Sequence, residues 1–225
     1  MKPDIKSPNA YAEKIIDVTC KLGVTPHELE SLIQGLRKLG LMLIRFSEVK
    51  RETLESDTDH TVMLAVVACA VTAKWLPELD IGKVAQYALV HDLVEAYCGD
   101  ISTSDFRAVD FGSKEKNEEE ARHTMEIEFG AFPWLHKTIQ EYEALSTPEA
   151  RFIKTLDKAM PALIHNLNDG CLFEKEEPGE LQKSVRARGE WLRAQGYAND
   201  QELALSIREV LMEWVIACQW EKSGQ

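Results

Sequence analysis

Ionisable residues interrupt an apolar stretch of the chain at residues 89–97. The stretch reads LVHDLVEAY and places His91 next to Asp92, with Glu95 one helical turn further on. Residues three or four apart are neighbours on a helix, so these side chains are expected to share a face. Charged groups in such a segment are costly to bury unless they are paired, hydrogen-bonded or bound to a metal.

Two more ionisable residues lie at or in apolar helical patterns. His60 precedes an Ala/Val-rich run, and Asp157 lies on the apolar side of the helix predicted around it. With His91 and Asp92 they offer two imidazoles and two carboxylates, a set that suits Mn²⁺, Co²⁺ or Fe²⁺, with Mg²⁺, Ni²⁺ and Zn²⁺ as further candidates. The residues alone leave another interpretation open, in which His60 begins a helix, His91 is a hydrogen-bonded core residue and Asp157 is an ordinary helix carboxylate.

Hydrophobic spacing predicts helices along the whole chain and no strands, so the expected fold class is all-α. The predicted helices cover residues 8–20, 26–40, 60–75, 81–97, 114–129, 134–142, 148–167, 180–194 and 200–220. Polar residues at 47–59 and 100–113 predict loops. The helices that carry the ionisable residues must therefore pack together to bring them to one place.

Sequence patterns also predict where two of these helices begin. Thr25 and Glu28 form a capping-box pattern, and the helix that follows is expected to end near Gly40. A residue within 57–59 is expected to cap the next helix, which puts His60 in its first turn.

The composition limits the classes of function. The chain has 225 residues, 44% of them hydrophobic, which is enough for one domain with a substantial core. Its net charge of −12 argues against a nucleic-acid polymer or an anionic membrane as partner. Its five scattered cysteines form no C-x-x-C pair, and the N-terminus has no apolar signal core, so we expect a cytoplasmic protein.

The order His60, His91-Asp92, Asp157 resembles the signature of the HD-domain metal-dependent phosphohydrolases, an all-helical superfamily. Longer blocks resemble its 5′-deoxynucleotidase branch, namely ESDTDH at 55–60, HDLVEAYCGDI at 91–101, EYE at 141–143 and EARFIKTLDK at 149–158. A bare His-Asp dipeptide is weakly specific, whereas these spaced blocks together are strongly specific.

The resemblance implies a domain organisation. It extends over about residues 36–168, and we expect a single HD domain with that helical core and terminal helical extensions at 1–35 and 169–225. Related enzymes resemble dimers, and the apolar helices near the C-terminus would suit an interface, so a homodimer is expected.

The resemblance also implies a role for each matched residue. The four residues that match metal ligands are His60, His91, Asp92 and Asp157. Glu95 matches the acidic residue that orients or activates the attacking water. Arg45 matches an arginine directed at the substrate phosphate, and Phe46 replaces the aromatic residue, usually Trp, beside it. Asp100 matches the aspartate of a Gly-Asp pair near the reacting phosphate or sugar.

The implied reaction is release of inorganic phosphate from deoxynucleoside 5′-monophosphates. Other reactions of the superfamily stay open, namely hydrolysis of deoxynucleoside triphosphates to triphosphate and hydrolysis of cyclic nucleotides. A triphosphate pocket would need more cations near the metal, for which the candidates are Lys50, Arg51, Lys154 and Lys158. A non-catalytic domain that binds a nucleotide or a partner helix is the remaining alternative.

Overall fold

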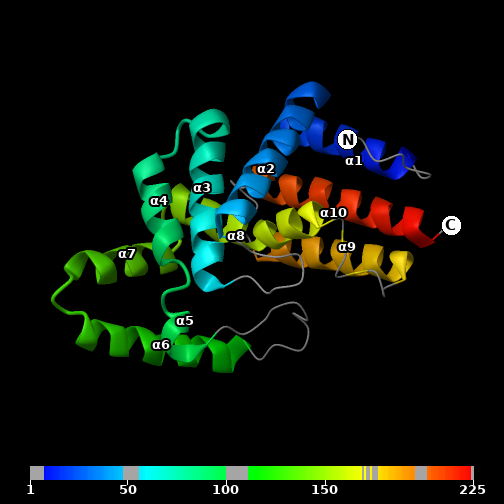
Figure 1. Cartoon of the computed structure of the whole chain (residues 1–225). Coiled ribbons are helices and arrows are strands. Elements are labelled where there is room, and N and C mark those ends of the chain that lie inside the picture. Colours follow the sequence, from blue (N-terminus) through cyan, green and yellow to red (C-terminus); the bar gives the residue numbers. More distant parts are fainter. Residues whose placement is uncertain are drawn as a thin grey trace. The chain divides into compact units, whose positions relative to one another are not determined.

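Helices form every regular element that the structure describes. A computed structural model describes residues 8–47, 56–99, 111–168, 170, 173, 177–195 and 202–223, and these residues include no strand. Their helices (Figure 1) are α1 (Pro8–Leu22), α2 (Pro26–Ser47), α3 (Asp57–Trp75), α4 (Ile81–Val90), α5 (Glu95–Cys98), α6 (Phe111–Glu128), α7 (Pro133–Glu143), α8 (Pro148–Leu167), α9 (Pro178–Ala194) and α10 (Glu202–Ser223). The predicted all-α class is confirmed. Within the described ranges, no helix combines the length and apolar content that crossing a bilayer requires.

The chain divides into two compact units. The first contains residues 1–55 and 154–225, and the second contains residues 56–153. Helix α8 runs from Pro148 to Leu167 without a break, so its first turns belong to the second unit and its remainder to the first. A single domain over the whole chain stays a prediction.

Buried polar contacts join three helices of the first unit. α1 and α9 pack against α10, which is buried along most of its length. Arg37 of α2 donates hydrogen bonds to the backbone and side-chain oxygens of Asn166 in α8, and its guanidinium lies 4.6 Å from the ring centroid of Trp214 in α10. Asn166, which is fully buried, donates in turn to the Leu211 carbonyl at 3.3 Å. These contacts fix α2, α8 and α10 to one another within this unit.

The capping box at the start of α2 is confirmed, but the predicted end of this helix is wrong. The Oε2 atom of Glu28 accepts from the Thr25 backbone N–H at 2.7 Å, and Thr25 Oγ1 accepts from the Glu28 N–H at 3.2 Å. Gly40 does not end α2, which continues to Ser47. A Cβ added to Gly40 would lie 2.5 Å from Leu167 Cδ1, so this glycine allows the close approach of α8 to α2.

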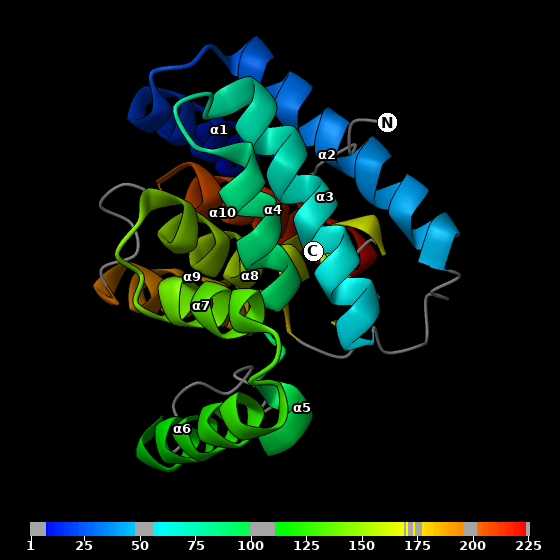
Figure 2. The same ribbon diagram turned by 90° about the vertical axis from the view of Figure 1, so that its left-hand side faces the viewer.

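Helices α3 and α4 form the centre of the second unit. Six residues of α3 are buried, namely Met63, Leu64, Val67, Ala68, Val71 and Thr72. α4 packs along α3, and α7 packs against α4, as Figure 2 shows from the side. α5 packs against α6 through a separate contact. The N-terminus of α4 is capped by Asp80, whose Oδ1 accepts from the N–H groups of Gly82 and Lys83.

The single helix predicted over residues 81–97 is wrong in its second half. α4 ends at Val90, residues 91–94 form turns, and α5 covers only Glu95–Cys98. Four backbone N–H groups here donate to the carbonyl three residues earlier, at 2.9–3.3 Å, namely those of Leu93, Glu95, Ala96 and Tyr97. This is the 3₁₀ pattern, which aligns residues three apart. Asp92 and Glu95 are therefore aligned, and His91 and Glu95 do not lie on one continuous α-helix.

Candidate active site

His91 lies immediately after the last residue of α4, with its side chain fully buried. Its Nδ1 atom is 2.8 Å from the Ala88 carbonyl oxygen, and its Nε2 atom is 2.8 Å from Oδ2 of Asp92. A carbonyl oxygen only accepts hydrogen bonds, so Nδ1 carries the proton. In the neutral ring the Nε2 lone pair then faces a carboxylate oxygen, an arrangement that a proton or a metal cation between the two atoms would stabilise.

The first turn of α3 carries His60 beside His91. The two ring centroids are 5.3 Å apart, at an interplanar angle of 39°. Ser56 caps α3, because its Oγ accepts from the Asp59 N–H and donates to Asp59 Oδ2. The cap is therefore Ser56 and not a residue of 57–59, since a serine hydroxyl at this position reaches the third helical residue. The cap fixes the turn that presents His60.

Asp157 lies in α8 and is only 7% exposed. Its Oδ2 atom accepts a hydrogen bond from the ammonium group of Lys158, the next residue of the helix. A buried carboxylate is stable only with a cationic or hydrogen-bonding partner, so the lysine offsets part of its charge.

The four ligand-type residues of the sequence signature come together in the structure. One nitrogen or oxygen atom from each of four side chains lies within 4.8 Å of the others, the residues being His60, His91, Asp92 and Asp157. Two imidazole nitrogens and two carboxylate oxygens are donors that divalent transition metals accept, and the Nδ1–H of His91 is held as a metal-ligating imidazole requires. The chain therefore has a His/Asp group that could hold a divalent metal.

The remaining predicted site residues are described only in part. Glu95 begins α5, partly exposed, and is aligned with Asp92 by the 3₁₀ turn. Arg45 and Phe46 lie in the last turn of α2, and their side chains fall outside the described part of the structure. Asp100 also lies outside the described residues.

Two features of the site could not be found by residue type. The Ala88 carbonyl that orients His91 is a backbone group and leaves no pattern in the sequence. Tyr142 contacts the His91 ring edge-on, with centroids 6.5 Å apart. In the sequence, this tyrosine appeared only within the EYE block at 141–143, and the resemblance implied no role for it.

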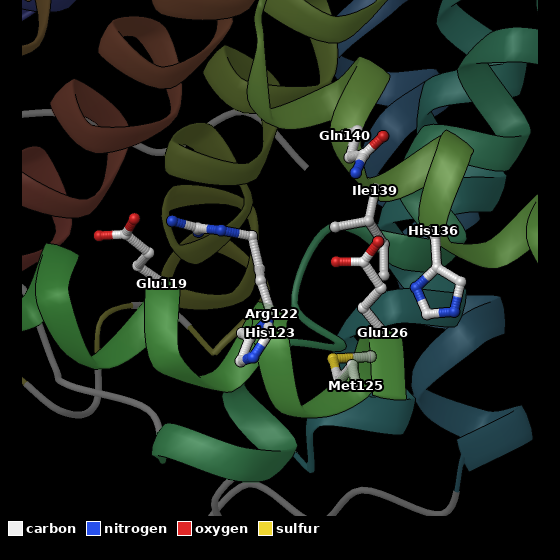
Figure 3. Close-up of a pocket in the computed structure, with 8 residues that line it drawn as sticks. All are labelled: Glu119, Arg122, His123, Met125, Glu126, His136, Ile139 and Gln140. Carbon is white, nitrogen blue, oxygen red and sulfur yellow. The ribbon is translucent and has the colours of Figure 1, made fainter. Parts of the chain in front are cut away.

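A separate cavity lies between α6 and α7 (Figure 3). Its volume is about 250 Å³, and its lining residues are Glu119, Arg122, His123, Met125, Glu126, His136, Ile139 and Gln140. None of the predicted site residues lines it. Tyr97 of α5 donates a hydrogen bond to Glu128 of α6, and this bond raises the pKa of the phenol.

An all-helical chain with this His/Asp group has the architecture of a metal-dependent phosphohydrolase. The chain belongs to the HD domain family, whose pattern matches residues 43–193 and so includes all four ligand-type residues. It is 33% identical to the 5′-deoxynucleotidase HDDC2 of Homo sapiens over 162 residues, which are 69% of this chain and 76% of that protein.

Two further relatives carry the same activity in their names. The 5′-deoxynucleotidase HDDC2 of Bos taurus is 34% identical over 158 residues, which are 68% of this chain and 73% of that protein. The 5′-deoxynucleotidase hdd1 of Schizosaccharomyces pombe is 28% identical over 116 residues, 48% of this chain and 54% of that protein. No solved structure matches the chain.

Proposed function

We propose that this HD-domain enzyme is a 5′-deoxynucleotidase that releases inorganic phosphate from deoxynucleoside 5′-monophosphates. The observation that carries the proposal is the group of two histidines and two aspartates whose ligand atoms lie within 4.8 Å of one another. The similarity to 5′-deoxynucleotidases over about two thirds of the chain supports the choice of substrate.

The four members of this group are proposed as the metal ligands: His60, His91, Asp92 and Asp157. A divalent metal held there would supply Lewis acidity toward a phosphoryl oxygen and toward the attacking water. The nitrogen and oxygen donors favour Mn²⁺, Co²⁺ or Fe²⁺, with Mg²⁺, Ni²⁺ and Zn²⁺ as weaker candidates. His91 would donate through Nε2, because its Nδ1–H is bound to the Ala88 carbonyl.

Glu95 is proposed as the residue that takes the proton of the attacking water. The water oxygen forms a bond to phosphorus, the bond from phosphorus to the sugar 5′-oxygen breaks, and a proton returns to the departing alcohol. A carboxylate in this role typically contributes about 10²–10⁴ in rate. The alignment of Glu95 with Asp92 supports the assignment, because it puts the carboxylate one 3₁₀ turn from a proposed ligand.

Three substrate contacts are proposed from the resemblance. The Arg45 guanidinium would bind phosphate oxygens in a bidentate fork, and Phe46 would pack near the nucleoside. Asp100 would lie near the reacting phosphate or sugar. The expected result for Arg45→Met is a higher KM for the monophosphate with a smaller change in kcat.

The test is a product analysis with defined substrates. The purified chain, reconstituted with Mn²⁺ or Co²⁺, would be incubated with dAMP, AMP, dATP and a cyclic nucleotide. We expect inorganic phosphate from dAMP and no product from His60→Ala, which controls for contaminating phosphatases. Tripolyphosphate from dATP would instead identify a triphosphohydrolase, and a linear nucleotide would identify a phosphodiesterase. Metal binding without turnover of any substrate would favour the non-catalytic alternative.

Three broader properties belong to the same proposal. We propose a homodimer, which light scattering of the purified chain tests through its mass. We propose the cytoplasm as compartment, based on the scattered cysteines, and cell fractionation tests this assignment. A free nucleotide rather than a nucleic-acid polymer is the proposed partner, because the net charge of −12 would repel a polyanion.

A further inference from the structure

We propose that Tyr142 is a positioning residue for His91, whose imidazole it holds in the orientation needed for metal binding. The inference rests on the proposed function, because it treats His91 as a ligand. Tyr142 is 1% exposed and lies at the end of α7. Its ring meets the His91 ring at 89°, with a centroid distance of 6.5 Å, which is a favourable edge-to-face arrangement.

The hydrogen bond to Ala88 does not by itself fix the His91 ring. It restrains Nδ1 at one edge, whereas Nε2 lies at the far side of the ring, where any tilt displaces it most. The neighbouring aromatic rings limit that tilt, His60 at an interplanar angle of 39° and Tyr142 near the perpendicular. Because His60 is itself a proposed ligand, its position would depend on the bound metal. Tyr142 is the aromatic neighbour of His91 whose position would not.

Tyr142 is in turn fixed to α4. It packs against Tyr87 with ring centroids 6.2 Å apart, and Tyr87 is also 1% exposed. The Tyr87 hydroxyl donates to Oε2 of Glu141 at 3.3 Å, next to Tyr142 in the chain. Tyr87 lies four residues before His91, so these contacts hold the last turn of α7 against α4 one helical turn before His91. Figure 2 shows the two helices side by side.

A purely structural role for Tyr142 makes a different prediction. A core aromatic stabilises the fold wherever it is buried, and its loss would loosen the metal site no more than the loss of another buried ring. Phe152 is the matched control, because it is fully buried in the second unit and has a ring of similar size.

The experiment measures the affinity of the full-length apo-protein for Mn²⁺ by calorimetry and records the visible spectrum of its Co²⁺ form. Wild type would be compared with Tyr142→Phe, Tyr142→Leu, Phe152→Leu and His91→Ala. Circular dichroism checks that each variant is folded, and Tyr142→Met replaces the leucine variant if that one does not fold. Loss of the group that orients a metal-ligating histidine typically weakens metal binding about 10–100-fold.

We expect Tyr142→Leu to weaken Mn²⁺ binding by about tenfold or more and to alter the Co²⁺ spectrum. Tyr142→Phe and Phe152→Leu are expected to stay near wild type, because the first keeps the ring and the second does not touch His91 in the described contacts. Wild-type affinity in Tyr142→Leu, or an equal loss in Phe152→Leu or Tyr142→Phe, would overturn the inference. Absence of metal binding in wild type would refute the proposed function itself, and the inference with it.

Discussion

The Oε1 atom of Glu149 accepts a hydrogen bond from the backbone N–H of Asp80 at 3.0 Å. Glu149 lies in the first turn of α8, and Asp80 caps α4, so the bond joins the starts of two helices within the second unit. These are the helices that lead to His91 and Asp157. Glu149 is only 7% exposed, so its carboxylate is largely shielded from solvent.

Glu149→Ala is expected to lower the free energy of unfolding by about 0.5–1.5 kcal/mol, because it removes the part-buried hydrogen bond that joins the starts of the two helices. Urea denaturation measures the loss. Glu28→Ala is the control, since the Glu28 carboxylate also accepts a backbone N–H but is exposed, and water replaces it. Equal losses of unfolding free energy in the two variants would show that burial does not increase the contribution of the Glu149 hydrogen bond to stability.

Glu95→Gln is expected to keep the metal and to lose turnover by about 10²–10⁴-fold, because the amide cannot take a proton from water. Metal analysis and steady-state kinetics on dAMP check the two halves of the prediction separately. The same substitution at Glu119, an exposed residue of α6, serves as control. Turnover near the wild-type rate in Glu95→Gln would remove this residue from the mechanism.

Gly170 and Gly23 offer a matched pair for backbone strain. Both have positive φ, +67° and +65°, but a Cβ at Gly170 would lie 2.6 Å from Gln219 Nε2 and 2.7 Å from Val215 Cγ1, whereas nothing lies within 4 Å at Gly23. Gly23→Ala is expected to cost about 1 kcal/mol through strain alone. Gly170→Ala adds an overpacking cost of about 1–3 kcal/mol. Thermal unfolding of both variants tests the difference, and equal stability losses would contradict the described contact.

His165 makes stability depend on pH. Burial, and secondarily the nearby Arg208 guanidinium, lowers the pKa of His165 from 6.5 to about 4. The unfolded chain therefore binds a proton between these values that the folded chain does not, so stability is present above pH 6.5 and is lost as the pH falls toward 4. Between pH 7 and pH 5, wild type should lose about 2 kcal/mol more than His165→Gln. Free energies of unfolding that change equally with pH in wild type and His165→Gln would contradict this prediction.

Much of the fold follows from local sequence patterns. Apolar spacing indicated the long helices, and the Thr25–Glu28 pair indicated the start of α2 correctly. The break between α4 and α5 was not predicted, because the apolar residues of 81–97 continue through it and spacing does not distinguish α from 3₁₀ bonding. Gly40 was misread as a helix end, since only the packed structure reveals the side chain of Leu167 against it.

The residues of the candidate site could be predicted from the sequence, but the groups that orient them could not. His60, His91, Asp92 and Asp157 stood out because ionisable groups rarely occur in apolar helices without a function. The groups that orient His91 are a backbone carbonyl and a buried tyrosine, which resemble ordinary core structure in a sequence. Their roles depend on tertiary distances, and residue type alone does not encode these.

The most direct measurement is the metal content of the purified chain. After loading with Mn²⁺ and removal of excess ion, we predict one ion per wild-type chain by mass spectrometry. Asp157→Ala should retain far less metal and no activity on dAMP, whereas Asp17→Ala, which removes an exposed carboxylate of α1, should match wild type. A wild-type chain without metal, or an Asp157→Ala variant with a full equivalent, would contradict the convergence of the four side chains on a single cation.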